Sequence, residues 1–209
     1  MRLAAALVLL VALLACASAV AGEAAQYRPN PRDMAAARAS LLRASDLGVS
    51  WTGGPKKASR PYGLGCGTSR VVTGAAEAEF SAVGGLDIQS HVQVLQDEAM
   101  VRAEIGRAGW AAVVRCLATG LEQTAGLGAK VVSTGRLPFP LLGDVTAAYR
   151  VILDLTAQGP NARMIVDVVA IGVRRTETSL VSVAPAQAGT ALLASEQSLA
   201  RALLGRARP

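Results

Sequence analysis

The chain has 209 residues, of which 52% are hydrophobic and only 3% aromatic, and its formal net charge is +6. This length fits one domain with a core of aliphatic side chains. The basic residues are scattered rather than interleaved with aromatic ones, so no nucleic acid partner is expected.

Residues 1–21 have the layout of a secretory signal. A basic start precedes the apolar run from Leu3 to Leu14, and small residues suited to cleavage follow at positions 17–21. We therefore expect export, to the extracellular space or the cell envelope. Cleavage before Cys16 is the alternative, because residues 13–16 read as a lipobox. Cys16 would then carry lipid and tether the protein to a membrane.

Either route leaves two thiols, those of Cys66 and Cys116, in an oxidising compartment. We predict a disulfide between them; two buried free thiols are the alternative. The bond closes a loop of about 50 residues, which chain-entropy arguments value at about 4 kcal/mol. Two cysteines and a single histidine, His91, are too few for a usual metal site, so neither a metal nor another cofactor is expected.

The next segments predict a tether, a helix and a loop. Residues 22–31 are small, polar and proline-flanked, as in a tether, and they lead into a single exported domain over residues 32–206. Asn30 and Pro31 suit a helix start, and apolar residues at helical spacing continue to Gly48, a residue type that commonly ends helices. Residues 50–69 are rich in Gly, Pro and Lys and predict a surface loop.

The rest of the chain predicts strands joined by short turns, with two further helices. Leu86 to Leu95 alternates apolar and polar residues, which predicts a half-buried strand with His91 on its exposed face. The expected fold class is α+β: an antiparallel sheet of about six strands packed with helices. The strands are expected at 70–83, 86–95, 130–137, 145–157, 163–173 and 178–184, and the helices at 97–123 and 188–206.

Motifs for nucleophilic, metal-dependent or phosphate chemistry are missing from the sequence. Asp154 and Asp167 lie within apolar strands, where two carboxylates can form a general acid–base pair. Aspartates in strands more often face solvent or pair with a neighbour, here Arg150 or Arg163. No catalytic residue is therefore predicted, and a small secreted hydrolase stays the alternative.

The loop over residues 50–69 carries three cations, Lys56, Lys57 and Arg60. Loops on a rigid scaffold often carry recognition, and these charges would attract an anionic ligand such as an envelope lipid or glycan. The competing interpretation is that they only make the surface soluble.

Several segments together resemble a known family. They are LLRASDLGVSW, VVTGAAEAEF, HVQVLQDEAM, CLATGL, GDVTAAYRV and RRTETSLVSV, spread over Arg32 to Arg206. The pattern resembles actinobacterial exported sensor-like domains: the extracellular domain of PknH-type serine/threonine kinases and the LpqN-type envelope lipoproteins. This resemblance implies a Mog1/PsbP-like sandwich with a cleft and no established chemistry. PknH-type domains usually carry a second disulfide, for which this chain lacks the cysteines.

Export, the missing catalytic motifs and the resemblance together predict an envelope-associated, non-catalytic binding or sensor-like domain for an unknown ligand. The hydrolase is one alternative. A structural protein of envelope assembly is the other, and it would show a flat apolar patch in place of a cleft.

Overall fold

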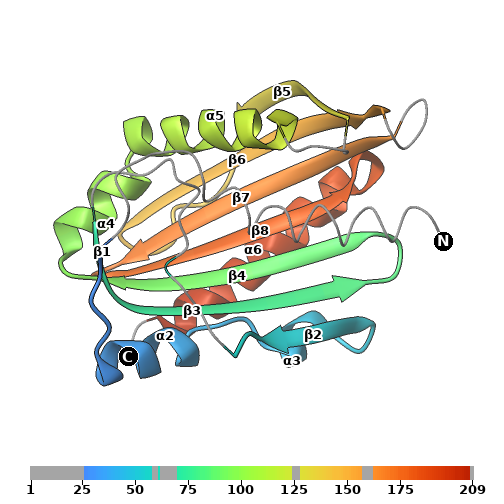
Figure 1. Ribbon diagram of the computed structural model, residues 1–209. Helices are drawn as coiled ribbons and strands as arrows, with labels where there is room; N and C mark the ends of the chain where they lie inside the picture. The colour runs from blue at the N-terminus through green and yellow to red at the C-terminus, as the bar shows by residue number, and fades with distance from the viewer. Residues whose placement is uncertain (1–25, 58–60, 62–69, 124–127, 157–161, 208–209) are drawn as a thin grey trace.

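The computed structural model describes residues 26–57, 61, 70–123, 128–156 and 162–207, without the side chains of residues 107–110. These residues form one twisted sheet with helices on both faces (Figure 1). The fold class predicted from the sequence, an α+β sandwich with a mostly antiparallel sheet, is confirmed.

The sheet has eight strands, in the order β1-β3-β4-β8-β7-β6-β5, with β2 also paired to β3. Every pairing is antiparallel except that of β1 with β3. Tight turns set this arrangement: Gly84 and Gly85, both at positive φ, join β3 to β4. The strands are β1 (Gln26–Tyr27), β2 (Trp51–Pro55), β3 (Val71–Ala82), β4 (Leu86–Leu95), β5 (Ala129–Arg136), β6 (Val145–Leu155), β7 (Arg163–Val173) and β8 (Thr176–Pro185).

Helices form a layer on each face of the sheet. On one face α4 (Glu98–Ile105) and α5 (Arg107–Gln123) pack against the half that contains β5, β6 and β7. On the other face α2 (Pro31–Ala39) packs against β3, and α6 (Gly189–Arg206) crosses β7 and β8. A single 3-10 turn, η3 (Ala186–Ala188), leads from β8 into α6. Both layers bury Val, Leu, Ile and Ala side chains, as the composition predicts.

The N-terminal part is more divided than predicted. The expected helix from residue 31 splits into α2 and a short α3 (Ala44–Leu47), because the link between them turns Leu41 and Leu42 into the core. The expected loop begins with the edge strand β2, and the tether contains β1. These two strands raise the total above the six expected. Gly53 permits the close pairing of β2, since a Cβ there would collide with the Glu79 carbonyl of β3.

His91 is the clearest difference from the sequence-based expectation. Both faces of β4 are buried, and His91 is only 6% exposed. The alternation of polar and apolar residues is real, but its polar face does not meet water. Burial lowers the pKa of His91 to about 3, so the ring is neutral at physiological pH.

No helix among the described residues combines the length and the apolar character that a membrane crossing requires.

Candidate binding cleft beside helix α6

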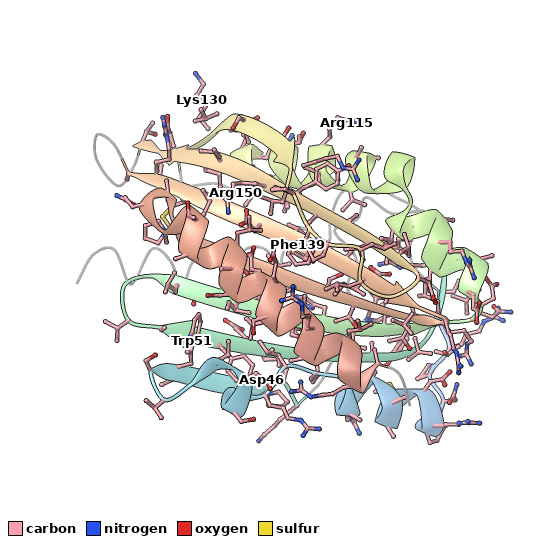
Figure 2. The ribbon with its side chains drawn as sticks, turned by 180° about the vertical axis from the view of Figure 1, so that it is seen from behind. Asp46, Trp51, Arg115, Lys130, Phe139 and Arg150 are labelled. Atoms are coloured by element: carbon pink, nitrogen blue, oxygen red, sulfur yellow. The ribbon has the colours of Figure 1, made fainter. Side chains whose placement is uncertain are left out.

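A cleft of about 280 Å³ lies on the α6 face of the sheet, between α6 and the segment formed by α3 and β2. We call it the α6 cleft. Figure 2 shows Trp51 and Asp46 together on this side of α6, whereas Arg150 lies on the other side of the helix. The lining is mostly apolar: Leu47, Trp51, Leu86, Ile88, Ala188, Ala191, Leu192 and Leu199, with Asp46, Ser195 and Ser198 as its polar members.

Helix α6 supplies one wall of the cleft. Its lining residues recur at spacings of three and four, which places them on one side of a helix. Leu192 and Leu199 are buried, whereas Ser195 and Ser198 are exposed. The helix therefore presents an apolar inner edge and a hydroxyl-bearing outer edge to a ligand.

The opposite wall comes from α3 and β2. Trp51 opens β2 directly opposite Ala82 of β3, and its half-buried side chain packs against the core beneath α6. A single indole at the mouth of an aliphatic cleft offers a large, rigid contact surface.

Among the described residues that line the cleft Asp46 alone is charged, and its charge is already compensated. Arg206 Nη2 donates to Asp46 Oδ1 at 2.5 Å, and Arg206 Nη1 donates to the Leu41 carbonyl at 2.8 Å. The backbone N–H of Arg43 donates to Asp46 Oδ2 at 2.7 Å. Asp46 therefore fixes the distance between the two walls and leaves the cleft without an unpaired charge.

A buried polar cluster lies under α6, on the side of the helix that faces the sheet. We call Arg150, Asp167, Ser182 and Glu196 the α6 polar cluster. Arg150 donates to both oxygens of Asp167, from Nε at 2.7 Å and from Nη2 at 2.5 Å. Arg150 Nη2 also donates to the Gly189 carbonyl at the start of α6, at 3.0 Å. One guanidinium therefore ties β6, β7 and α6 together.

The two aspartates considered as a catalytic pair do not come together. Asp154 lies opposite Arg163 and bonds to it at 2.7 and 3.2 Å, whereas Asp167 lies opposite Arg150. Hydrogen bonds from Arg163 lower the pKa of Asp154. Each carboxylate is thus the acceptor of its own arginine, and the pair offers no general acid beside a general base.

The remaining predicted site residues are scattered. Lys56 forms an ion pair with Glu79, and Lys57 is exposed. Cys116 lies half-buried on α5. Its predicted partner Cys66, the loop cation Arg60 and the lipidation candidate Cys16 lie outside the described residues, so the disulfide and the lipid anchor stay predictions.

The sequence carries one signal that the prediction of the C-terminal helix left unused. Glu196 stands between Leu192 and Leu199, four residues after one and three before the other, so all three share one helical face. An acid inside an apolar stripe indicates either a buried carboxylate or an interruption of the stripe. In the structure Glu196 is 0% exposed.

The fold and the cleft define a sandwich domain with a small apolar site at the edge of one helical layer. Comparison of the chain with protein-family models, with curated proteins and with solved structures finds no match. The resemblance to sensor-like domains therefore stays a prediction. Among the described residues no three His, Cys, Asp or Glu side chains gather as they would around a metal ion.

Proposed function

We propose that the chain is an exported binding domain that takes a small, mostly apolar molecule, such as a short acyl chain, into the α6 cleft. One observation carries this proposal. Large apolar side chains from α3, β2, β4 and α6 converge on one cleft, and its one charged residue, Asp46, is held by Arg206. Such a lining favours burial of an apolar group over recognition of an ion.

The volume of the cleft limits the size of the ligand. Ligand sites for drug-sized molecules usually enclose about 300–1,000 Å³. The α6 cleft, at about 280 Å³, lies just under that range and fits a small molecule with one or two aromatic ring systems or one short chain. Ser195 and Ser198 at its outer edge are exposed and can hydrogen-bond a polar end group, Ser195 as an acceptor because its hydroxyl donates to the Ala191 carbonyl.

The proposal changes the position of the predicted ligand but not the class of protein. Lys56, one of the three loop cations expected to attract an anionic partner, is already paired with Glu79. We therefore place the ligand in the cleft, with the apolar part of an envelope lipid as one source of such a group. The leader over residues 1–21 supports export, and no described residue of the cleft is a histidine or cysteine that could act as a nucleophile or base.

Binding of an uncharged fluorescent dye, N-phenyl-1-naphthylamine, tests the proposal. We expect saturable binding to the wild-type protein, with quenching of Trp51 emission in a Trp110→Phe background, where Trp51 is the only tryptophan. A short-chain alcohol or fatty acid should displace the dye if the site accepts acyl chains.

Two alanines on α6 provide a matched pair of variants. Ala191 lines the cleft and Ala194 does not, and both are exposed. Ala191→Phe should fill the cleft and weaken dye binding at least tenfold, whereas Ala194→Phe should leave it unchanged. Equal effects of the two substitutions, or no saturable binding by the wild type, would overturn the proposal.

A further inference from the structure

Glu196 is the most unusual side chain of the α6 polar cluster. It is 0% exposed, neither of its carboxylate oxygens makes a hydrogen bond of ordinary geometry, and the polar side chains beside it are Ser182 and Asp167. The hydroxyl of Ser182 on β8, also 0% exposed, lies beside Glu196 and likewise makes no hydrogen bond of ordinary geometry. A buried ionised carboxylate without donors is strongly unfavourable, so this site is built for the protonated form of the acid.

The charges around Glu196 favour the same form. Asp167 faces it from β7 and Arg150 from β6, while β8 contributes the uncharged Ser182. The turn η3 has no titratable residue, and Asp46 of α3 pairs with Arg206 near the far end of α6. Since Asp167 already takes two hydrogen bonds from Arg150, ionised Glu196 would be a second negative charge beside a single cation. Burial first, and then Asp167, raise the pKa of Glu196 to about 8.

Glu196 is mechanically connected to the α6 cleft. Leu192 and Leu199, one helical turn away on either side, line that cleft. The start of α6 is held by the bond from Arg150 to the Gly189 carbonyl. A Cβ at Gly189 would come within 2.8 Å of Arg150 Nη1, so the helix and the guanidinium are in close contact there. A change in how α6 lies on the sheet at Glu196 therefore moves the inner wall of the cleft.

We propose that α6 is a proton-sensitive wall of the α6 cleft: protonated Glu196 lets α6 lie against β7 and β8 with the cleft formed, and loss of that proton to solvent puts a second negative charge beside Asp167, loosens the helix and releases the ligand. The inference rests on the proposed function, because it concerns the regulation of the same cleft. It assigns to an exported binding domain a ligand affinity that falls as the surroundings become alkaline.

The test compares dye binding by the wild type and Glu196→Gln at pH 6 and pH 9. N-phenyl-1-naphthylamine stays uncharged over this range. At pH 9, one unit above the pKa of Glu196, about a tenth of the protein keeps the proton, so the wild type should bind the dye about tenfold more weakly than at pH 6. Glu196→Gln, which cannot ionise, should bind equally at both pH values. Wild-type binding that does not change with pH would overturn the inference, as would an equal loss of dye affinity at pH 9 in Glu196→Gln.

A second measurement separates this inference from the proposed function. Urea denaturation needs no ligand: the midpoint of the wild type should fall between pH 6 and pH 9 by more than that of Glu196→Gln. If the dye binds to neither protein, the proposed function fails, while the denaturation difference still decides whether α6 senses the proton. Glu196→Met, an apolar side chain of similar length, replaces Glu196→Gln if the amide variant does not fold. Parallel midpoints in the wild type and the variant would overturn the switch.

Discussion

Two arginine–aspartate pairs join β6 to β7, and each member lies directly opposite its partner in the register of the two strands. Arg163 and Asp154 lie at the end of the strands, with side chains 50% and 39% exposed. Arg150 and Asp167 lie four residues further into the same pairing, with side chains 21% and 0% exposed. Both pairs are bidentate, so their local chemistry is the same and only their surroundings differ.

The difference shows that burial, rather than the pairing itself, decides what an ion pair does in this protein. In the exposed pair, water solvates each charged group and salt screens most of the attraction between them. Among the described residues Arg150 is the cation that compensates the charge of Asp167, and the same guanidinium also bonds to the start of α6. The inner pair therefore holds the start of α6 against the sheet, whereas the outer pair lies at an exposed strand end.

Truncation of each arginine in turn tests whether burial decides the contribution of the two ion pairs to stability. Arg150→Ala leaves Asp167 buried without a cation and should lower the free energy of unfolding by about 3–5 kcal/mol. Arg163→Ala is the matched control, because its partner Asp154 can return to water, and it should unfold close to the wild type. Urea denaturation followed by circular dichroism measures both, and equal losses would contradict the assignment of roles.

Two strand glycines extend the contrast to packing. A Cβ at Gly172 of β7 would lie 2.5 Å from Val101 and 2.6 Å from Val145, whereas one at Gly135 of edge strand β5 would meet nothing. Gly172→Ala should therefore cost roughly 1–3 kcal/mol by overpacking the contact with α4. Gly135→Ala should be neutral in the same thermal melt. A destabilised Gly135→Ala beside an unaffected Gly172→Ala would show that crowding is not the cause.

His91, on the opposite face of the sheet, provides a further test of how burial affects a titratable group. The folded protein keeps the ring neutral down to about pH 3, while the unfolded chain takes up a proton near the ordinary pKa of 6.5. The free energy of unfolding therefore decreases as pH falls below 6.5, by about 1.4 kcal/mol at pH 5.5. His91→Gln removes this contribution, so the drop between pH 7.5 and pH 5.5 should be smaller in the variant. An identical pH dependence of the two proteins would place His91 in water.

The smallest effect belongs to the outer pair itself. Asp154→Asn should lower the melting temperature slightly at low salt, because hydrogen bonds and attraction from Arg163 favour the ionised carboxylate. At about 1 M salt the Debye length shrinks to about 3 Å, and the difference from the wild type should vanish. A difference that survives high salt would mean that the strand end is less solvated than its exposure indicates.

The sequence predicted the elements that depend on local pattern. Alternation in Leu86 to Leu95 located β4, and the helical spacing of Leu192 and Leu199 located α6. The strand β2 was missed, because its Gly-Gly-Pro sequence has little strand preference of its own and its pairing comes from β3. The helix break after Ala39 was missed because Leu41 and Leu42 fit the helical period. In the structure they reach the core from the link between α2 and α3.

Much less of the candidate site could be predicted from the sequence. Its walls come from residues 46–51, 86–88 and 188–199, which no local pattern connects. Lys56, Lys57 and Arg60 were the predicted binding residues because charge is visible in a sequence. Trp51 and Leu192 become neighbours of one cleft only after β2 pairs with β3 and α6 lies across the sheet.

What the amino-acid sequence determined by itself is therefore the order of the long strands and of the helices that flank them, together with an aliphatic core, since periodicity acts over a few residues. The tertiary structure alone decided which polar groups lie in water. In the sequence His91 belongs to the polar positions of an alternating strand and Glu196 to the leucine stripe of a helix, and both are buried because other segments cover them. Their protonation, the two roles of the arginine–aspartate pairs and the α6 cleft all follow from that covering, because the cost of a charge depends on its surroundings and not on its place in the chain.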